Sequence, residues 1–253
     1  DKPDAVQAIA ARHGTLTRLK VDNMEQQHQL LVVDKPGTVY SLIAVVPGLG
    51  FEQIVKELGA EVTVMTQKNP SVRDLLLAVN KCLSESVFLF TNDSNATLAA
   101  NEVVKLTDKM LTIIPTRDIV AGIAGLFAFR SAGRQAPSLE RILQAAAHPR
   151  SAQVFFAGKD AVIGGTSVTH GKPAATCDGA LYGGASIPEA LRNVLQAMGA
   201  EHGGLITLYY GGAQKEKDAQ HSSEELRAIF PQAEIEYYYG GQKNAEFVVS
   251  LDE

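Results

Sequence analysis

A repeated alternation of apolar and helical segments between residues 38 and 130 most constrains the fold. Each short apolar run is followed by a turn and then by apolar residues at helical spacing. The expected strands are 38–46, 61–65, 86–90 and 110–115, and the expected helices are 51–59, 72–83, 96–107 and 119–130. Strand–helix units of about 25 residues predict parallel strands joined by right-handed crossover helices. The apolar runs hardly alternate with polar residues, as is typical of strands covered on both faces.

The pattern changes after the segment SAGRQAPS (131–138), which contains Gly and Pro and is predicted to be a linker. Glycine turns interrupt the strands beyond it, and these strands are expected to pair antiparallel. The expected strands are 152–158, 160–165, 167–184, 204–211, 235–241 and 245–251, and the expected helices are 139–148, 187–198 and 222–230. This second half predicts an α/β lobe on a mixed or antiparallel sheet.

Composition narrows the class of protein. The chain has 253 residues, of which 45% are hydrophobic and 20% charged, as in a globular protein with a sizeable core. A net charge of −5 and a pI of about 5.7 argue against a nucleic-acid-binding face. Cys82 and Cys177 form neither a metal-binding spacing nor a disulfide framework, which fits a reducing cytoplasm. The sequence has no apolar run long enough for a membrane span and no secretion signal.

The carboxyl ends of the parallel strands are the expected place for a ligand. The loops there are 47–50, 66–71, 91–95 and 115–118, and each precedes a predicted helix. Helix N-termini offer backbone N–H groups that suit a carboxylate or phosphate. The candidate ligand or partner residues are Thr66, Asn69, Ser71, Asn92, Asn95, Thr97 and Arg117. The alternative, which sequence alone favours, is that such side chains only cap helices.

No motif assigns a catalytic or metal-binding residue. Gly48 and Gly50 form half of a dinucleotide fingerprint, but Gln53 stands where the third glycine belongs, so a tight turn explains them better. The six histidines are scattered, and no nucleophile elbow, P-loop or magnesium-binding aspartate cluster is present. An independent hydrolase or transferase is therefore the weakest hypothesis.

Several longer strings carry a resemblance to a known family. They are LKVDNMEQQH, VVPGLGFEQIVKELGAEVTV, NPS, PTRDIVAGIAGLFAF, ITLYYG and EIEYYYGGQ. In this order they resemble the C-terminal half of the YloV/FakA family of fatty acid kinase A proteins. The resemblance implies a two-lobed DegV-like (EDD) fold related to the FakB fatty acid carriers. It places the tail of a preceding middle domain and a connector at 1–33, a parallel α/β lobe at 34–134 and a second lobe with a mixed sheet at 135–253.

The resemblance also implies a division of labour. In this family an N-terminal dihydroxyacetone-kinase-like (DhaL) domain binds ATP and magnesium, and the enzyme phosphorylates the carboxyl group of a fatty acid bound to FakB. This chain opens at Asp1 with a helical segment, so we expect a piece of a longer protein or a polypeptide trimmed to its own ends. The aspartate-rich magnesium motif has no counterpart here, so we expect no cofactor and no kinase activity in this chain.

Two loops resemble the headgroup loops of the carriers, which have patterns like TSQPS and SSGLSGT. Segment 66–71 keeps Thr66, Pro70 and Ser71, and segment 91–97 keeps Thr97 but has Asn95 in place of a serine. The resemblance therefore implies an inherited lipid-headgroup site that now serves structure or docking.

The leading hypothesis is a cytoplasmic, non-catalytic module that docks a FakB-type fatty acid carrier. A homodimer is a further expected partner, and nucleic acid is not. The alternative is a DegV-type fatty-acid-binding protein that holds a lipid carboxylate between its lobes.

Overall fold

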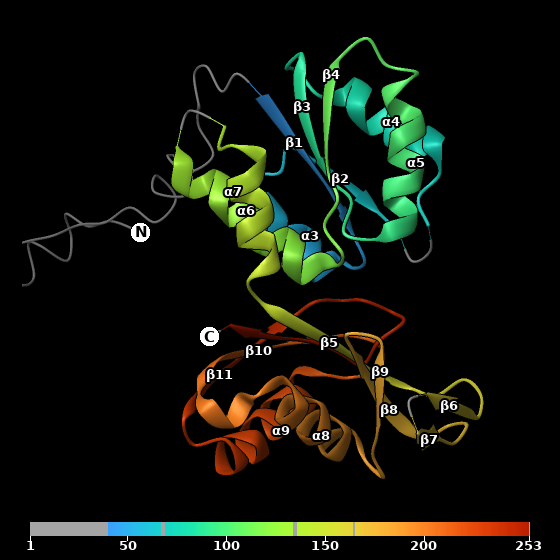
Figure 1. The fold of residues 1–253 in the computed structure, drawn as a ribbon, viewed down its shortest axis with the longest axis vertical. Coiled ribbons are helices and arrows are strands. Elements are labelled where there is room, and N and C mark those ends of the chain that lie inside the picture. Colours follow the sequence, from blue (N-terminus) through green and yellow to red (C-terminus); the bar gives the residue numbers. More distant parts are fainter. Residues whose placement is uncertain (1–39, 67–68, 134–135, 164, 253) are drawn as a thin grey trace, which may run out of the picture. The chain divides into compact units, whose positions relative to one another are not determined.

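The computed structural model describes residues 40–66, 69–133, 136–163 and 165–252. They belong to a compact unit that runs from Thr38 to Glu253. Within this unit the chain forms two α/β lobes, one with a parallel sheet and one with a mixed sheet, as predicted (Figure 1). The predicted middle-domain tail and connector, residues 1–33, lie outside the described residues.

The first lobe is built on a four-stranded parallel sheet of order β2-β1-β3-β4. The strands are β1 (Tyr40–Val46), β2 (Val62–Met65), β3 (Ser86–Phe90) and β4 (Met110–Ile114). All seven residues of the central strand β1 are buried, because helices cover both faces of the sheet. The parallel arrangement predicted from the alternating segments is confirmed.

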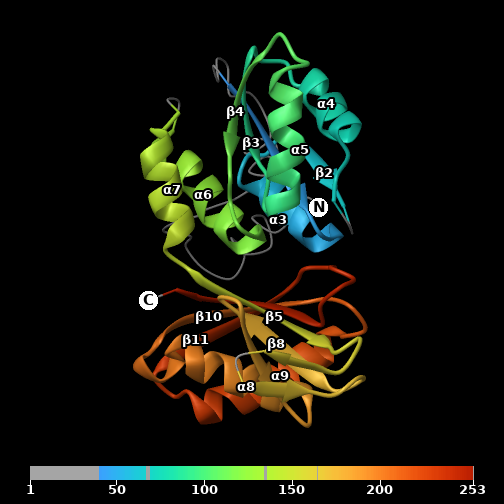
Figure 2. The ribbon, with the colours of Figure 1, turned by 45° about the vertical axis from the view of Figure 1, so that its right-hand side comes forward.

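Helices α3, α6 and α7 lie on one face of this sheet, and α4 and α5 lie on the other (Figures 1 and 2). The helices are α3 (Leu49–Glu57), α4 (Val72–Lys81), α5 (Ser94–Val104), α6 (Ile119–Ala132) and α7 (Leu139–Ala147). Helix α7 packs against α6, and its Ile142 belongs to the same core cluster as Phe129. The division of the lobes at residue 134 stays a prediction.

The second lobe has a six-stranded sheet of order β11-β10-β12-β5-β8-β9 and a separate hairpin, β6–β7. Its strands are β5 (Arg150–Phe156), β6 (Ala161–Ile163), β7 (Thr166–Val168), β8 (Pro173–Cys177), β9 (Ala180–Gly183), β10 (Gly204–Tyr210), β11 (Ala233–Tyr239) and β12 (Phe247–Asp252). Strands β10 and β11 are parallel and the other pairs are antiparallel. The helical segments are α8 (Ile187–Met198), η1 (Ala200–His202) and α9 (Glu216–Ile229).

The start of α9 differs from the sequence prediction. The helix begins at Glu216 rather than at residue 222, so most of the charged segment 215–225 is helical. The backbone N–H of Lys215 donates to the Asp218 carboxylate at 2.9 Å, which stabilises this earlier start. The parallel pairing of β10 and β11 follows, because α9 is the crossover between them.

The lobes meet at a contact between four glycines, which we call the glycine junction: Gly48, Gly50, Gly240 and Gly241. The N–H of Phe51 donates to the carbonyl of Gly240 at 3.1 Å, and Gly48 forms an isolated β-bridge with Gln242. A Cβ atom on Gly50 would lie 1.8 Å from the Tyr239 carbonyl oxygen. The backbones therefore approach so closely that side chains are excluded. This contact, rather than a nucleotide, explains the half fingerprint.

Side chains from both lobes pack around the glycine junction. The rings of Phe51 and Tyr209 have centroids 4.9 Å apart, and Val248 belongs to the same core cluster. Buried Gln242 donates from Nε2 to the Tyr209 carbonyl at 2.8 Å. Its Oε1 has no hydrogen-bond partner among the described residues and lies close to Gly240. The first lobe is thus fixed on the sheet of the second by a shared core.

Tyr209 makes this core sensitive to alkaline pH. Burial raises the pKa of Tyr209 to about 12, whereas the pKa of a tyrosine in an unfolded chain is about 10. The protonated Tyr209 therefore contributes its full stabilisation to the folded state below about pH 10. Between about pH 10 and 12 the unfolded chain loses this proton first, and the free energy of unfolding falls by about 2 kcal/mol. We expect Tyr209→Phe to unfold with a smaller pH dependence between these values. Urea unfolding followed by circular dichroism at pH 9 to 12 measures this, and equal slopes for Tyr209→Phe and wild type would contradict it.

Candidate functional site

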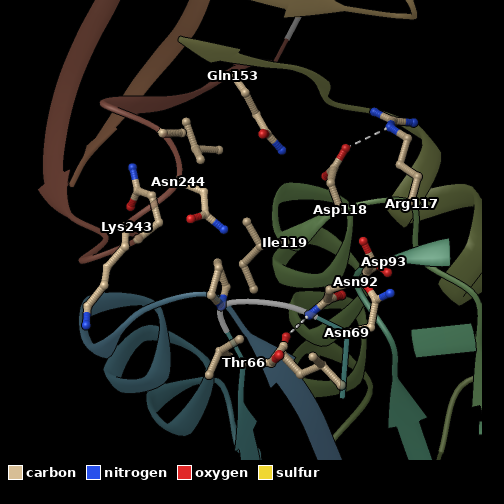
Figure 3. A pocket seen from close by; sticks show the side chains of 16 residues that line it. Thr66, Asn69, Asn92, Asp93, Arg117, Asp118, Ile119, Gln153, Lys243 and Asn244 are labelled. Atoms are coloured by element: carbon tan, nitrogen blue, oxygen red, sulfur yellow. Dashed lines mark hydrogen bonds and ion pairs between the residues drawn. The ribbon is translucent and has the colours of Figure 1, made fainter. Parts of the chain in front are cut away.

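A cavity of about 320 Å³ opens where the strands β1 to β4 end, at the place predicted from the sequence (Figure 3). Both lobes line it. The lining residues are Val45, Val46, Pro47, Thr66, Asn69, Asn92, Asp93, Arg117, Asp118, Ile119, Gln153, Gln242, Lys243, Asn244, Ala245 and Val248. Its walls are a mixture of amide, carboxylate and cationic groups with apolar patches from β1, α6 and β12.

The structure brings four of the predicted site residues together at this cavity. They are Thr66, Asn69, Asn92 and Arg117. The other three, Ser71, Asn95 and Thr97, do not belong to the lining. Ser71 is the N-cap of α4, the Asn95 side chain is exposed, and the Thr97 hydroxyl lies 2.7 Å from that of Thr91. Ligand or partner binding by any of the seven residues stays a prediction.

Asn92 is held by the protein itself. It adopts a left-handed backbone conformation with φ of 54°. Its Nδ2 donates to the Val45 carbonyl at 2.7 Å, and its Oδ1 accepts from the Thr116 hydroxyl at 2.6 Å. A Cβ atom on Gly122 would lie 2.0 Å from that Oδ1. The Asn92 amide therefore ties β1 to the loop after β4 and lies tightly against α6.

Arg117 is likewise engaged within the chain. Its Nε donates to Asp118 at 3.1 Å (Figure 3). Its terminal nitrogen donates to the Pro149 carbonyl. The same Asp118 oxygen accepts from the hydroxyl of Ser151 at 2.5 Å. These contacts join the start of α6 to the beginning of β5, so Arg117 helps to connect the lobes.

The helix N-termini around the cavity are already occupied by acceptors from the chain. Asp93 Oδ1 accepts from the N–H groups of Asn95 and Ala96 at the start of α5. Asp118 Oδ1 accepts from Ala121 N–H at the start of α6. The Ser71 hydroxyl caps α4, and the Gly240 carbonyl accepts a hydrogen bond from the Phe51 N–H at the start of α3. Capping, the alternative that the sequence favoured, accounts for much of the polar character of these loops.

The sequence did not single out the part of the lining that comes from the second lobe. Gln153 lies on β5, and Gln242, Lys243 and Asn244 lie on the turn between β11 and β12. Figure 3 shows Gln153 reaching toward the cavity from the side opposite Thr66. The Gly-Gly-Gln string after the tyrosine-rich strand was the available signal, since paired glycines mark a tight turn.

Neither cysteine is an activated nucleophile, and the described residues hold no grouped metal ligands. Burial raises the pKa of Cys82 to about 11 and also raises the pKa of Cys177, so both thiols stay protonated at neutral pH. In the part of the chain that the structure describes, no three His, Cys, Asp or Glu side chains are grouped to hold a metal ion. Within the same part, every helix is too short or too polar to cross a membrane.

Comparison with known proteins places this chain in a family. The C-terminal family of FakA-like fatty acid kinase proteins matches residues 41–252. Protein YloV of Bacillus subtilis is 26% identical over 265 residues, which cover 100% of this chain and 48% of YloV. A Staphylococcus saprophyticus relative is 22% identical and is again covered over 48% of its length. The chain thus spans about half the length of these relatives.

Solved structures show the same fold. A DegV family protein of Corynebacterium glutamicum has a TM-score of 0.58 at 13% identity, covering 83% of this chain and 96% of that one. DegV of Bacillus subtilis, described as a fatty acid binding protein, has a TM-score of 0.55 at 12% identity and covers 85% of this chain and 99% of its own. The chain therefore belongs to the FakA-like C-terminal family of fatty acid kinase proteins and has a two-lobed DegV-like fold.

Proposed function

We propose that this chain is a non-catalytic docking module that binds a fatty acid carrier protein. A kinase domain elsewhere in the parent protein, with ATP and magnesium, would phosphorylate the fatty acid that the carrier holds. Membership of the FakA-like C-terminal family supports this role.

The helix N-termini at the cavity already bind the chain's own side chains, which favours docking over lipid binding. A lipid carboxylate placed at the ends of β3 and β4 would meet the carboxylates of Asp93 and Asp118, which already accept the N–H groups of α5 and α6. Like charges at such close range repel, and these helix N–H groups already donate to the chain's own carboxylates. The cavity is therefore poorly suited to a fatty acid headgroup.

The core beneath the cavity also disfavours the alternative of a bound fatty acid. A volume of about 320 Å³ is at the lower end for small-molecule sites. Phe51, Phe90 and Phe129 are fully buried in the core on the α3 and α6 side of the sheet. An acyl chain would have to displace these rings, and losing the packing of one buried phenylalanine costs about 3 to 5 kcal/mol.

We expect the carrier to contact the surface around Gly241, which directly precedes the cavity-lining residues Gln242 and Lys243. Leu49 and Tyr239 are 61% and 50% exposed. Both lie against Gly241, because a Cβ atom there would be 2.9 Å from the Tyr239 ring and 3.1 Å from the Leu49 nitrogen. Lys243 follows two residues later and lines the cavity. Exposed aromatic and aliphatic side chains beside a polar rim are typical of protein interfaces.

We expect Leu49→Glu to weaken carrier binding at least tenfold. Leu49 is the first residue of α3, where an acidic side chain is compatible with the helix, so the variant should fold. Burying a leucine contributes about 1.5 kcal/mol or more, and a tenfold change corresponds to about 1.4 kcal/mol. Isothermal titration of the 253-residue chain with a purified, fatty-acid-loaded carrier measures the effect.

Leu83→Glu is the matched control. Leu83 is 91% exposed and lies before β3, at the opposite end of the sheet from the cavity. Its substitution should leave carrier binding within about twofold, since surface changes away from an interface have small effects. Equal losses for both variants, or no wild-type binding at tens of micromolar carrier, would argue against docking at this surface.

Native mass spectrometry separates docking from lipid binding. The proposal predicts that the purified chain has the mass of the polypeptide alone. A co-purified fatty acid that is lost on filling the cavity, for example with Ala245→Phe, would instead support the alternative. The expected homodimer stays a prediction, and the same spectra report the oligomeric state.

A further inference from the structure

Strand β4 lies at one edge of the parallel sheet and has an open side. Among the described residues it pairs only with β3. The N–H of Met110 donates to the Glu85 carbonyl at 2.9 Å, and the Ile114 carbonyl accepts an N–H from the residue after β3 at 3.3 Å. Met110 and Ile114 therefore direct their backbone groups toward β3. Because this direction alternates along a strand, the N–H and C=O groups of Leu111 and Ile113 face the open side, where the described chain supplies no further strand.

This open side, which we call the β4 edge, lacks the usual protection against pairing. Natural edge strands are blunted by charged side chains, proline or bulges. The sequence of β4 is Met-Leu-Thr-Ile-Ile, paired without a bulge, and the ammonium group of Lys109 just before it donates to the Ser84 carbonyl at 3.3 Å. At β11, the edge strand of the other sheet, Arg227 instead covers the Ile235 carbonyl with a hydrogen bond of 2.7 Å. The β4 edge is therefore available to pair with another strand.

A stripe of apolar side chains lies on α7, next to the β4 edge. Helix α7 packs against both α6 and β4, and Figure 2 shows it at the outside of the helix layer. Leu139, Leu143 and Ala147 are spaced four residues apart and share one side of the helix, which we call the α7 stripe. With Glu140 and Gln144 they line a shallow groove that contains no residue of α6. The α7 stripe therefore faces away from α6, and the described residues leave it largely uncovered.

We propose that the β4 edge and the α7 stripe together form a homodimer interface, in which two copies of the chain join their parallel sheets into one. The two β4 strands pair antiparallel about a two-fold axis at Thr112. Leu111 of each copy exchanges hydrogen bonds with Ile113 of the other, so four hydrogen bonds use every backbone group of the β4 edge. The two α7 stripes lie on the same face of the joined sheet, one on each side of the axis, and pack against each other.

A second copy is the partner that fits these features best. The pairing is self-complementary, since the same uncharged residues meet across the axis and no like charges are opposed. The two Thr112 side chains face each other in the closely spaced position of an antiparallel pair, where threonine pairs are favourable. A strand edge alone covers less than about 800 Å² per partner, the size of a standard interface, and the α7 stripe supplies further area. The inference does not depend on carrier docking.

Sedimentation equilibrium of the 253-residue chain tests the interface. We expect a monomer–dimer equilibrium with a dissociation constant on the order of 10 μM, as for an interface of modest area. Thr112→Lys places two ammonium groups against each other at the axis. Leu139→Glu places a carboxylate on the α7 stripe at the first residue of the helix, where an acid is tolerated. Each variant should raise the dissociation constant by about tenfold or more.

Leu98→Glu is the matched control for these variants. Leu98 is 68% exposed and lies on α5, on the opposite face of the sheet from α7. This variant should dimerise like wild type, and circular dichroism melts should show all variants folded. A wild-type chain that stays monomeric at about 200 μM overturns the proposal. So does a dimer that neither Thr112→Lys nor Leu139→Glu weakens.

Disulfide formation gives a second test that leaves the interface intact. Opposed Cβ atoms in the closely spaced position are about 4.5 Å apart, which is within reach of a disulfide. Thr112→Cys, oxidised with glutathione disulfide, should therefore form at least about fivefold more covalent dimer than Leu98→Cys. Cys82 and Cys177 are buried and should contribute little. Equal cross-linking of the two variants would contradict a two-fold axis at Thr112 and overturn the proposal.

Discussion

Gly50→Ala is expected to lower the free energy of unfolding by about 3 kcal/mol, although alanine normally stabilises a helix. Gly50 is the second residue of α3, where exchanging glycine for alanine usually contributes about 0.5 to 1 kcal/mol. Here the new Cβ would lie 1.8 Å from the Tyr239 carbonyl oxygen and 2.5 Å from its carbonyl carbon. Backbone atoms cannot rotate away as the end of a side chain can, so the two lobes would have to move apart at this contact. Urea unfolding followed by circular dichroism measures the change.

Gly158→Ala is the matched control for this substitution. No atom lies within 4 Å of the position of its Cβ, and its φ is not positive. The free energy of unfolding should therefore change by no more than about 0.5 kcal/mol. Gly48→Ala should destabilise like Gly50→Ala, because its Cβ would lie 2.3 Å from the Gly241 carbonyl carbon. A Gly50→Ala protein as stable as wild type would show that the glycine junction does not hold the lobes together.

Phe51→Ala is expected to cost about 3 to 5 kcal/mol of unfolding free energy. The side chain is fully buried, and its ring packs 4.9 Å from that of Tyr209 in the other lobe. Removing a buried phenylalanine loses its transfer free energy and leaves a cavity that the surroundings fill only in part. Thermal and urea unfolding measure the loss. Carrier binding should also weaken, because Leu49 and Tyr239 come from different lobes.

Phe127→Ala provides the comparison. Phe127 is also on a helix of the first lobe, but its side chain is 58% exposed. Its truncation should cost less than about 1 kcal/mol, since little apolar surface returns to water. If both truncations cost similarly little unfolding free energy, the packing of Phe51 in the shared core would not stabilise the fold as expected.

The elements whose residues interact locally were predictable. Helix α8 was expected at 187–198 and is observed there, because Ser186 caps it, Pro188 lies in its first turn and Gly199 ends it in a left-handed conformation. The four parallel strands followed from their near-continuous apolar composition. In the same way the position of the cavity followed from the rule that ligand sites lie at the carboxyl ends of such strands.

The candidate site was only partly predictable. Thr66, Asn69, Asn92 and Arg117 line the cavity because their loops follow adjacent parallel strands. Gln153 and Lys243 come from strands and turns of the other lobe, and no local pattern indicates that they face those loops. Whether a capping side chain points into a cavity or back to its own helix also depends on neighbours, as the hydrogen bonds of Asp93 and Asp118 show.

The sequence by itself determined the α/β class, the order of the elements and the edge of the sheet where polar loops gather, since periodicity and capping act over a few residues. Only the tertiary structure decided that Gly48 and Gly50 serve contact with Gly240 and Gly241 rather than with a nucleotide. It also decided that the chain's own carboxylates occupy the helix N-termini. Both outcomes depend on atoms far apart in the sequence, whose approach is fixed by how one lobe packs on the other.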